Sequence, residues 1–431
     1  MSYKSWGLYP KVKNKAIEFE SISELKKQLS SIENYIPYGN GRSYGDSALN
    51  ETVIPMRQLN QILSLDENKG IIELEAGVLL SEILEFCIPK GWFLTVTPGT
   101  KLITVGGAIA SDVHGKNHHI DGCFSNSVVE FNLLQPNGEL ATCSSTQNDE
   151  LFRHTCGGQG LTGIIVKAKL QLKRIESSSI NQTTIKTDSL KETFEVFEKI
   201  KYEPYSVAWI DCLSTGEKLG RSHVMYGNFI SDGNLNIKKG LKLNIPFFFP
   251  STTLNKWTVK AFNWIYYNKQ FGKIKNSTVD FNSFFYPLDT INNWNRIYGR
   301  QGFLQYQFIL PLEVSYDGVK QILEILSKSG KGSFLAVLKL YGKQNENTLS
   351  FPMEGYSLAL DLKVSKSVFE LLDTLDKIVE DFGGRVYLSK DARLSKNSFD
   401  KTYRNAVLFR KYRSNNKLSV ISSVQSQRLE L

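Results

Sequence analysis

Three glycine-rich segments in the first 165 residues constrain the fold of this chain more than any other feature. They are YGNGRSYGD at 38–46, TPGTKLITVGGAIASDVHGKNHH at 97–119 and CGGQGLTGII at 156–165. Glycine reaches positive φ and has no side chain, so such backbone can point several N–H groups at one ligand. One such segment alone is also compatible with ordinary turns. Three in succession predict extended backbone contact with an elongated ligand that carries phosphate.

Two known phosphate-binding arrangements do not account for this pattern. The first segment lacks the G-x-G-x-x-G spacing and the strand–turn–helix setting of a Rossmann unit. The chain also has no GK[ST] sequence of the kind that ends a P-loop. The ligand is therefore expected in a different fold.

Strand and helix patterns alternate around the glycine-rich segments. GIIELEAG (70–77) alternates as a strand, and LLSEILEFCIPKG (79–91) has the spacing of a helix. After about residue 173 the glycine density falls, and the chain continues with patterns such as SLKETFEVFEKI (189–200) and FLQYQFILPL (303–312). A chain of 431 residues is too long for one core. We predict an α+β protein with a first domain at 1–177, completed by 385–431, and a second domain at 178–384.

Composition narrows the class of protein. No run of 18 apolar residues is present and the first residues lack the apolar core of a signal peptide, so we expect a protein that is cytoplasmic or peripheral to the inner membrane. The net charge of +9 favours an anionic partner, but no nucleic-acid signature accompanies it. Five cysteines without C-x-x-C predict reduced thiols, and the adjacent His118 and His119 lack the ligand spacing of a zinc site.

The three segments together resemble the PCMH-type FAD-binding domain of the vanillyl-alcohol oxidase superfamily. More narrowly, the chain resembles the decaprenylphosphoryl-β-D-ribose 2′-oxidase family almost from end to end. The stretches that carry this likeness include GRSYGD (41–46), GGAIASDVHGKNHH (106–119), GGQGLTGI (157–164) and GGRVYLSKDAR (383–393). The resemblance implies a two-subdomain FAD-binding domain and a substrate domain that has an antiparallel sheet with flanking helices.

The resemblance also implies which residues hold FAD. They come from the first two glycine-rich segments, from the adenine side of the third, and from the returning C-terminal segment. The implied residues are Pro37, Tyr38, Gly39, Asn40, Gly41, Arg42, Ser43, Tyr44, Gly45, Asp46, Ser47, Gly99, Thr104, Val105, Gly106, Gly107, Ser111, Asp112, Val113, His114, Gly163, Ile164, Ile165 and Tyr387.

His114 raises the question of how FAD is attached. In relatives that oxidise alditols and aldonolactones, a histidine in a Thr-His-Gly setting is bonded to the flavin. Here the setting is Asp112-Val113-His114-Gly115-Lys116, which matches the family that binds FAD without a covalent bond. Non-covalent binding is favoured. The alternative is an alditol or aldonolactone oxidase with FAD linked to His114, acting on a soluble sugar.

Alcohol oxidation needs a group that removes the hydroxyl proton while the carbon-bound hydrogen moves to the flavin. By the resemblance, Lys390 is the first candidate for this base or for a partner of the oxyanion. Lys339 is a second candidate, because a cation in the apolar strand VLKLYG is uncommon. Tyr44 either contacts flavin or substrate or fills the core of its own loop.

Substrate contacts are expected on a neighbouring strand. Gln305 and Gln307 share one face of LQYQF by the period of two, and Tyr306 faces the other way. His114, Lys339 and Ser357 complete the predicted substrate site. Relatives usually have asparagine where this chain has Ser357 and cysteine where it has Ala359, so thiol-directed inhibitors are not expected to react there.

The resemblance implies oxidation of the C2′ hydroxyl of a polyprenyl-phosphate-linked pentose to a 2′-keto sugar. It further implies that an NAD(P)H-dependent short-chain reductase completes an epimerisation for cell-envelope polysaccharide synthesis. A third reading, a membrane-bound carbohydrate-binding protein without turnover, predicts colourless protein and does not explain the glycine-rich segments.

Residues 238–275 have a composition of their own. They contain eight lysines, nine aromatic residues and no aspartate or glutamate. Lysines attract anionic headgroups and aromatic rings settle at the membrane interface, so the segment suits an anionic membrane surface. The alternative is a cap whose aromatic residues pack on its own domain.

Overall fold

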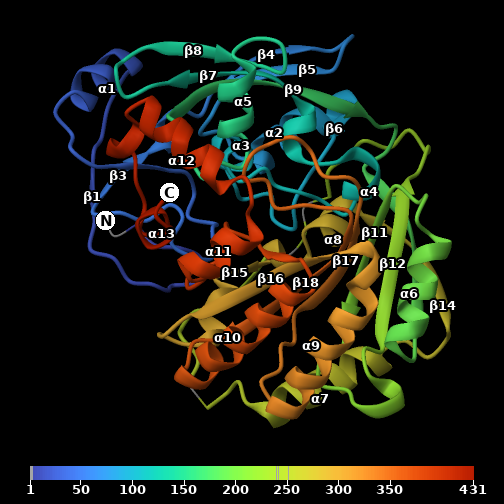
Figure 1. Ribbon diagram of the computed structural model, residues 1–431. Helices are drawn as coiled ribbons and strands as arrows, with labels where there is room; N and C mark the ends of the chain where they lie inside the picture. The colour runs from blue at the N-terminus through green and yellow to red at the C-terminus, as the bar shows by residue number, and fades with distance from the viewer. Residues whose placement is uncertain (1–2, 239, 241, 251) are drawn as a thin grey trace.

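The computed structural model describes residues 3–238, 240, 242–250 and 252–431, and it contains two large antiparallel sheets, one in each half of the molecule (Figure 1). The predicted segment 238–275 thus includes residues 239, 241 and 251, which lie outside the described residues. The mixed helix and sheet architecture confirms the predicted α+β class.

The first domain contains the six-stranded sheet β4-β5-β9-β7-β8, in which β6 pairs with β9. A small parallel sheet, β1-β3-β2, lies next to it in the chain. The strands are β1 (Lys15–Ala16), β2 (Ile36–Tyr38), β3 (Thr52–Pro55), β4 (Ile62–Asp66), β5 (Ile71–Glu75), β6 (Trp92–Leu94), β7 (Val128–Leu134), β8 (Leu140–Cys143) and β9 (Ile164–Arg174). The helices are α1 (Ile22–Leu29), α2 (Leu80–Cys87), α3 (Val105–Ala110), α4 (His118–Asp121) and α5 (Asp149–Thr155).

The second domain is built on the eight-stranded antiparallel sheet β14-β10-β12-β11-β17-β18-β16-β19. Its strands are β10 (Ser179–Thr187), β11 (Tyr205–Ile210), β12 (Ser222–Phe229), β14 (Ile274–Asp280), β16 (Phe303–Pro311), β17 (Ala336–Tyr341), β18 (Gly355–Lys363) and β19 (Arg385–Val386). A small parallel pair joins β13 (Leu243–Asn244) to β15 (Ile291–Asn292). The helices of this domain are α6 (Leu190–Lys199), α7 (Lys256–Asn268), α8 (Phe281–Phe285), α9 (Ser315–Ser329) and α10 (Lys366–Asp381).

Three helices, α6, α9 and α10, cover one face of the second sheet. In Figure 1, α6, α9 and α10 lie in front of it, and α9 and α10 contact β16. The side chains of β16 follow this division, because the Tyr306 hydroxyl donates to Asp376 of α10 whereas Gln305 and Gln307 point away from the helices. The predicted alternation along this strand is confirmed. The opposite face of β16 is therefore free to form one wall of a site.

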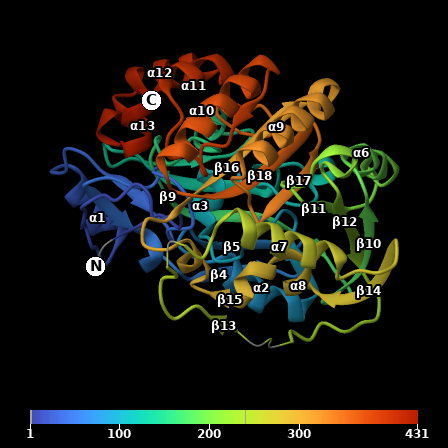
Figure 2. The ribbon, with the colours of Figure 1, turned by 90° about the horizontal axis from the view of Figure 1, so that it is seen from below.

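The end of the chain returns to the first domain. After β19, helices α11 (Lys396–Thr402), α12 (Ala406–Asn415) and α13 (Val424–Leu429) lie beside the amino-terminal segment in both ribbon views (Figures 1 and 2). Tyr35 forms a parallel bridge with Ile421. Because β19 pairs with β16, residues 385–386 belong to the second sheet, and the return to the first domain begins at Tyr387.

Arg428 joins this returning segment to the first glycine-rich loop. Its guanidinium donates to Asp46 at 2.8 Å and to Asp391 at 2.9 Å, and both carboxylates are almost fully buried. Burial raises the pKa of Asp46 to about 6, although Arg428 opposes this shift. Removal of the arginine would leave two buried carboxylates without their counter-ion.

Within the described residues, no helix is long and apolar enough to cross a bilayer.

We expect Arg428→Ala to lower the free energy of unfolding by about 3 kcal/mol, because it uncovers this buried pair of carboxylates. Chemical denaturation of the FAD-loaded protein measures the change. Lys396→Ala is the control, since it removes a largely exposed ion pair with Asp400 and should change stability much less. Equal effects of the two substitutions would contradict the assignment.

Candidate functional site

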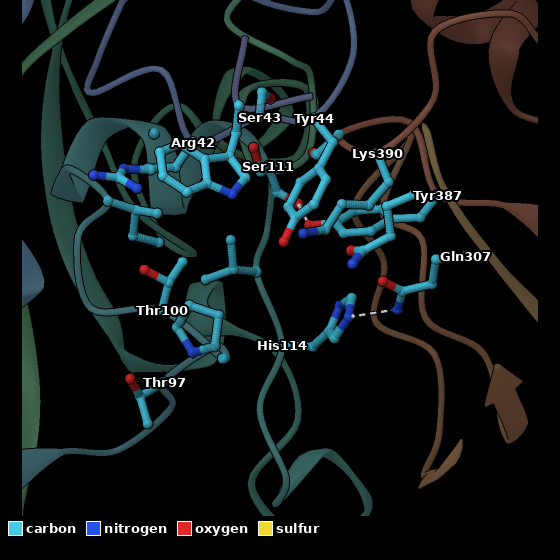
Figure 3. A pocket seen from close by; sticks show the side chains of 18 of the residues that line it. Arg42, Ser43, Tyr44, Thr97, Thr100, Ser111, His114, Gln307, Tyr387 and Lys390 are labelled. Atoms are coloured by element: carbon cyan, nitrogen blue, oxygen red, sulfur yellow. Dashed lines mark hydrogen bonds between the residues drawn. The ribbon is translucent and has the colours of Figure 1, made fainter. Parts of the chain in front are cut away.

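A cavity lies between the two domains. The cavity has a volume of about 390 Å³, and most of the surface that lines it is apolar. All three glycine-rich segments, the face of the second sheet opposite α9 and α10, and the segment 387–390 contribute to its walls. In Figure 3, Arg42 and Thr100 lie on one side of this space, and Tyr387, Lys390 and Gln307 lie on the other.

The first glycine-rich loop offers unused hydrogen-bond donors to the cavity. Within the described residues, the amide N–H groups of residues 40–43 have no acceptor in the protein. Gly41 has a φ of 61°, which lets successive amides turn toward a common point. The side chain of Arg42 lies 4.0 Å over the ring of Trp6, and its buried Nε has no partner. Such a loop suits an anion as the ligand.

Two glycines leave room for a flat or extended group beside this loop. A Cβ at Gly99 would meet no atom within 4 Å, and one at Gly107 would meet only Thr104 Oγ1, at 3.0 Å. Side chains at either position would therefore occupy the cavity. Together with the free amides, this cradle fits the FAD that the sequence predicts: phosphate oxygens at the loop and the ring system farther into the cavity.

Most of the predicted FAD residues line this one cavity. Those that do are Pro37, Gly39, Asn40, Gly41, Arg42, Ser43, Tyr44, Ser47, Gly99, Thr104, Gly106, Gly107, Ser111, Val113, His114, Gly163, Ile165 and Tyr387. The structure thus brings together residues that lie up to 350 positions apart in the sequence.

Six predicted FAD residues do not line the cavity, namely Tyr38, Gly45, Asp46, Val105, Asp112 and Ile164. Several of them instead hold the surrounding backbone. Asp112 accepts hydrogen bonds from Ser125, Asn347 and Ser350, which ties the second glycine-rich segment to a loop of the second domain. A Cβ at Gly45 would lie 1.6 Å from Asp391 O, so this glycine permits close packing of the returning segment.

Lys390 stands at the centre of the polar wall. Its Nζ lies 3.6 Å from the centroid of the Tyr44 ring, and both residues line the cavity (Figure 3). Burial lowers the pKa of Lys390 to about 7, although the nearby Asp361 carboxylate opposes this shift. A substantial fraction of Lys390 is therefore neutral near pH 7 and able to accept a proton. Tyr44 also packs edge-on against Phe303, so it is both a wall of the cavity and part of a small core.

Lys339 also reaches the cavity, from β17. Burial lowers its pKa to about 8. Its strand pairs with β18 so that Lys339 lies opposite Ser357, and Val337 lies opposite Ala359. Ala359 lines the cavity, whereas Ser357 does not. A methyl group thus stands where the relatives were expected to have a thiol.

The two glutamines of β16 are held by different partners. Gln305 donates to Asp361 Oδ1 at 2.6 Å, and Tyr298 approaches the other carboxylate oxygen at 3.4 Å. Gln307 donates to Ser357 Oγ at 3.2 Å and contacts His114 Nε2 at 3.1 Å. Both amides therefore present fixed polar atoms to whatever enters the cavity, and Ser357 acts by positioning Gln307.

His114 is enclosed by aromatic rings. Tyr341, Phe351 and Tyr387 pack around it, with ring centroids 4.9 to 5.5 Å from that of the imidazole. Burial, with Lys339 adding repulsion, keeps the pKa of His114 well below its ordinary value. The imidazole is therefore neutral, and its buried Nδ1 has no partner among the residues that the structure describes.

Sequence reasoning missed two charged groups of the site. Lys116 lines the cavity from the loop after α3, and its ammonium lies 4.2 Å from the centroid of the Phe284 ring. Burial lowers the pKa of Lys116 to about 7, and Lys339 adds to the shift. Asp361 is buried, and burial raises its pKa to about 7. The signal for Asp361 was present, because it is a charge inside the apolar strand GYSLALDL.

The adjacent histidines outside the cavity have structural partners. The Gly342 amide donates to Nδ1 of His118, whose Nε2 lies 3.3 Å from Cys123 Sγ. His119 Nε2 contacts the carbonyl of Glu203. Among the described residues, no group of three metal-ligating side chains comes together.

Comparisons with known proteins agree with this site. Residues 17–144 match the family described as FAD binding domain. The chain is 38% identical over 383 residues to decaprenylphosphoryl-β-D-ribose oxidase from Mycolicibacterium smegmatis, which covers 85% of this chain and 83% of that protein. It is 26% identical over 347 residues to an uncharacterized protein from Streptomyces coelicolor, which covers 76% of this chain and 92% of that protein. L-Gulonolactone oxidase from Bos taurus is 27% identical over 198 residues, 44% of this chain and 43% of its own length.

The FAD-binding match falls on the domain that supplies the free amides and the glycine cradle, and the mycobacterial match covers 85% of the chain. On this evidence the chain belongs to the decaprenylphosphoryl-β-D-ribose oxidase family, and it is an FAD-dependent oxidoreductase.

Proposed function

We propose that this enzyme oxidises the C2′ hydroxyl of a polyprenyl-phosphate-linked pentose to a 2′-keto sugar. The observation that carries the proposal is the placement of Lys390, with its lowered pKa, in one cavity with the FAD cradle and the two glutamines. The name of the mycobacterial relative supports the choice of a lipid-linked ribose.

The proposed roles follow from the protonation states. Neutral Lys390 Nζ accepts the proton of the substrate hydroxyl, and FAD supplies the acceptor for the hydride that leaves C2′. Tyr44, whose ring lies under the ammonium, stabilises the protonated lysine that results. The nearby carboxylate of Asp361 has the same effect, and it also fixes Gln305.

Substrate binding uses the remaining polar atoms of the wall. Gln305 and Gln307 are held in place by their own partners, so they can bond sugar hydroxyls without first being ordered. Neutral His114 adds an imidazole edge next to Gln307. Near pH 7, Lys339 with its pKa of about 8 is mostly protonated and Lys116 with its pKa of about 7 is partly protonated, which favours a substrate that carries a phosphate.

We propose that FAD is bound without a covalent bond. The His114 imidazole is held by Gln307 and packed among three aromatic rings, so it is already engaged on the substrate-facing side of the cavity. The second candidate function is that of an alditol or aldonolactone oxidase with FAD linked to His114. The partial match to bovine L-gulonolactone oxidase is the observation that favours it.

The lipid carrier of the proposed substrate indicates where in the cell the enzyme works. Such a substrate resides in a membrane, so we place the protein at an anionic membrane surface, peripheral to the inner membrane. An NAD(P)H-dependent short-chain reductase would take the 2′-keto product and complete the epimerisation for cell-envelope synthesis. The positive net charge supports an anionic surface as a partner.

Anaerobic addition of a lipid-linked ribose phosphate should bleach the visible absorbance of the bound flavin. Lys390→Ala should slow this bleaching by at least about 100-fold while FAD stays bound, because the hydroxyl proton loses its acceptor. Lys401→Ala, on the surface helix α11, is the matched control and should bleach like the original enzyme. Undiminished bleaching in Lys390→Ala would remove this lysine from the mechanism, and bleaching only by soluble alditols would favour the second candidate.

The rate of flavin reduction should rise with pH and level off above about pH 7, because Lys390 acts as a base only when neutral and its pKa is about 7. Stopped-flow measurements from pH 5.5 to 8.5 give the midpoint. Asp361 raises the pKa of Lys390, so Asp361→Asn should move this midpoint to lower pH. A midpoint that stays in place, or moves upward, would contradict the coupling of these two groups.

Acid precipitation should leave the yellow colour in the supernatant, because FAD is expected to be released when the protein unfolds. His114→Ala protein, reconstituted with FAD, provides the comparison. Colour that remains with the pellet of the original enzyme, but not with that of His114→Ala, would show a histidyl bond and overturn non-covalent binding.

A further inference from the structure

Helix α7 exposes apolar residues on the side that faces away from the protein. Its inner residues Val259, Asn263 and Tyr267 are buried. Asn263 donates to Asp211 at 2.9 Å, and the Tyr267 hydroxyl donates to Asp188 at 2.5 Å, which fixes the rotation of the helix. The opposite side, called here the outer face of α7, consists of Trp257, Lys260, Ala261, Trp264 and Ile265.

This outer face is unusual for a helix in contact with water. Trp257 is 75% exposed, Trp264 is 59% exposed and Ile265 is 62% exposed. Shortly after the helix, Phe271 is 98% exposed. Large apolar side chains grouped in this way mark a surface that meets another apolar phase. The alternative of a cap packed on its own domain therefore holds for the inner residues only.

The charged residues of the segment that contains α7 are all lysines. From residue 233 to residue 279 the sequence contains no aspartate or glutamate. The described lysines of this stretch (238, 242, 256, 260, 269, 273 and 275) are all exposed. Lys273 pairs with Glu192, and Lys269 lies over the Tyr266 ring, but Lys256 and Lys260 form no ion pair with any residue that the structure describes. Tryptophan beside free lysine suits the interface of an anionic bilayer.

The same helix contributes to the wall of the active-site cavity. Tyr266 lines the cavity and packs against Trp209, another lining residue, with ring centroids 4.6 Å apart. An α-helix with its side chains is about 10–12 Å across, so the outer face lies about one helix diameter from the cavity. Helix α7 lies at the lower edge of the molecule in Figure 1 and on the near side in Figure 2.

We propose that the outer face of α7 docks on an anionic phospholipid surface, with Trp257 and Trp264 in the interface and Lys256 and Lys260 against the headgroups. The inference deepens the proposed function, on which it rests for its physiological meaning, because it names the face that meets the membrane. Docking in this orientation brings the cavity wall formed by Tyr266 close to the bilayer, so a lipid-linked sugar enters without its chain leaving the membrane.

Vesicle flotation of the FAD-loaded protein tests the proposal without any substrate. The protein should float with vesicles that contain 30% anionic phospholipid and bind wholly zwitterionic vesicles much more weakly. Trp257→Ser combined with Trp264→Ser should lower the partition coefficient at least about tenfold, because the two indoles no longer enter the interface. Lys256→Gln combined with Lys260→Gln should lower it by about fivefold per lysine on anionic vesicles only.

Two controls keep the result interpretable. Tyr202→Ser combined with Val407→Ser removes exposed apolar side chains elsewhere, at 83% and 65% exposure, and should leave flotation unchanged. Retention of FAD by every variant shows that the fold is intact. Equal flotation of the tryptophan variant and the original protein would overturn the proposal. So would a lipid-free dimer that the tryptophan substitutions dissociate, because a second copy would then cover the face.

The flotation test of docking and the bleaching test of the proposed function can succeed or fail independently of each other. Flotation without bleaching by any lipid-linked sugar would leave docking established and remove the substrate. Bleaching by a short-chain soluble analogue, with unchanged flotation of the tryptophan variant, would keep the substrate and remove docking.

Discussion

The site depends on one short segment, residues 387–390, which is hydrogen-bonded to all three glycine-rich segments and to β16. Its Tyr387 amide donates to the carbonyl of Gln307 on the second sheet, and its Ser389 carbonyl accepts from the Tyr44 amide in the first glycine-rich loop. The Tyr387 hydroxyl donates to the carbonyl of Ser111, and Ser389 Oγ contacts Gln159. One turn of chain thus joins all three glycine-rich segments to the substrate sheet, and Lys390 is at its end.

The packing around this segment explains how three lysine side chains can share one buried cavity. Lys116, Lys339 and Lys390 come from different elements; burial lowers the pKa of all three, and Lys339 lowers the pKa of Lys116 and Lys390 further. Burial disfavours the charged form of a lysine, whereas an aromatic face or a carboxylate favours it. Asp361 and Tyr44 serve Lys390 in this way, so the lysine can change its charge during a reaction without a large penalty.

The sequence was most informative where a period or a family motif applied. Alternation along β16 correctly predicted that Gln305 and Gln307 share a face, and the apolar neighbours of Lys339 correctly predicted an inward cation. The fold class followed from the glycine-rich segments and the strand patterns. Lys116 was not recognised, because no period applies to a loop and only the packing of α8 brings Phe284 to its ammonium. Asp361 carried the same signal as Lys339 and was overlooked.

The return of the chain to its first domain has a consequence for biosynthesis. Arg428, which binds Asp46 in the first glycine-rich loop, is translated 382 residues after it. Domains usually fold in the order in which they leave the ribosome, but here the first loop cannot acquire its final partners until the second domain has been synthesised. Insertion of the cofactor into its finished pocket is therefore a late event in the life of each nascent polypeptide.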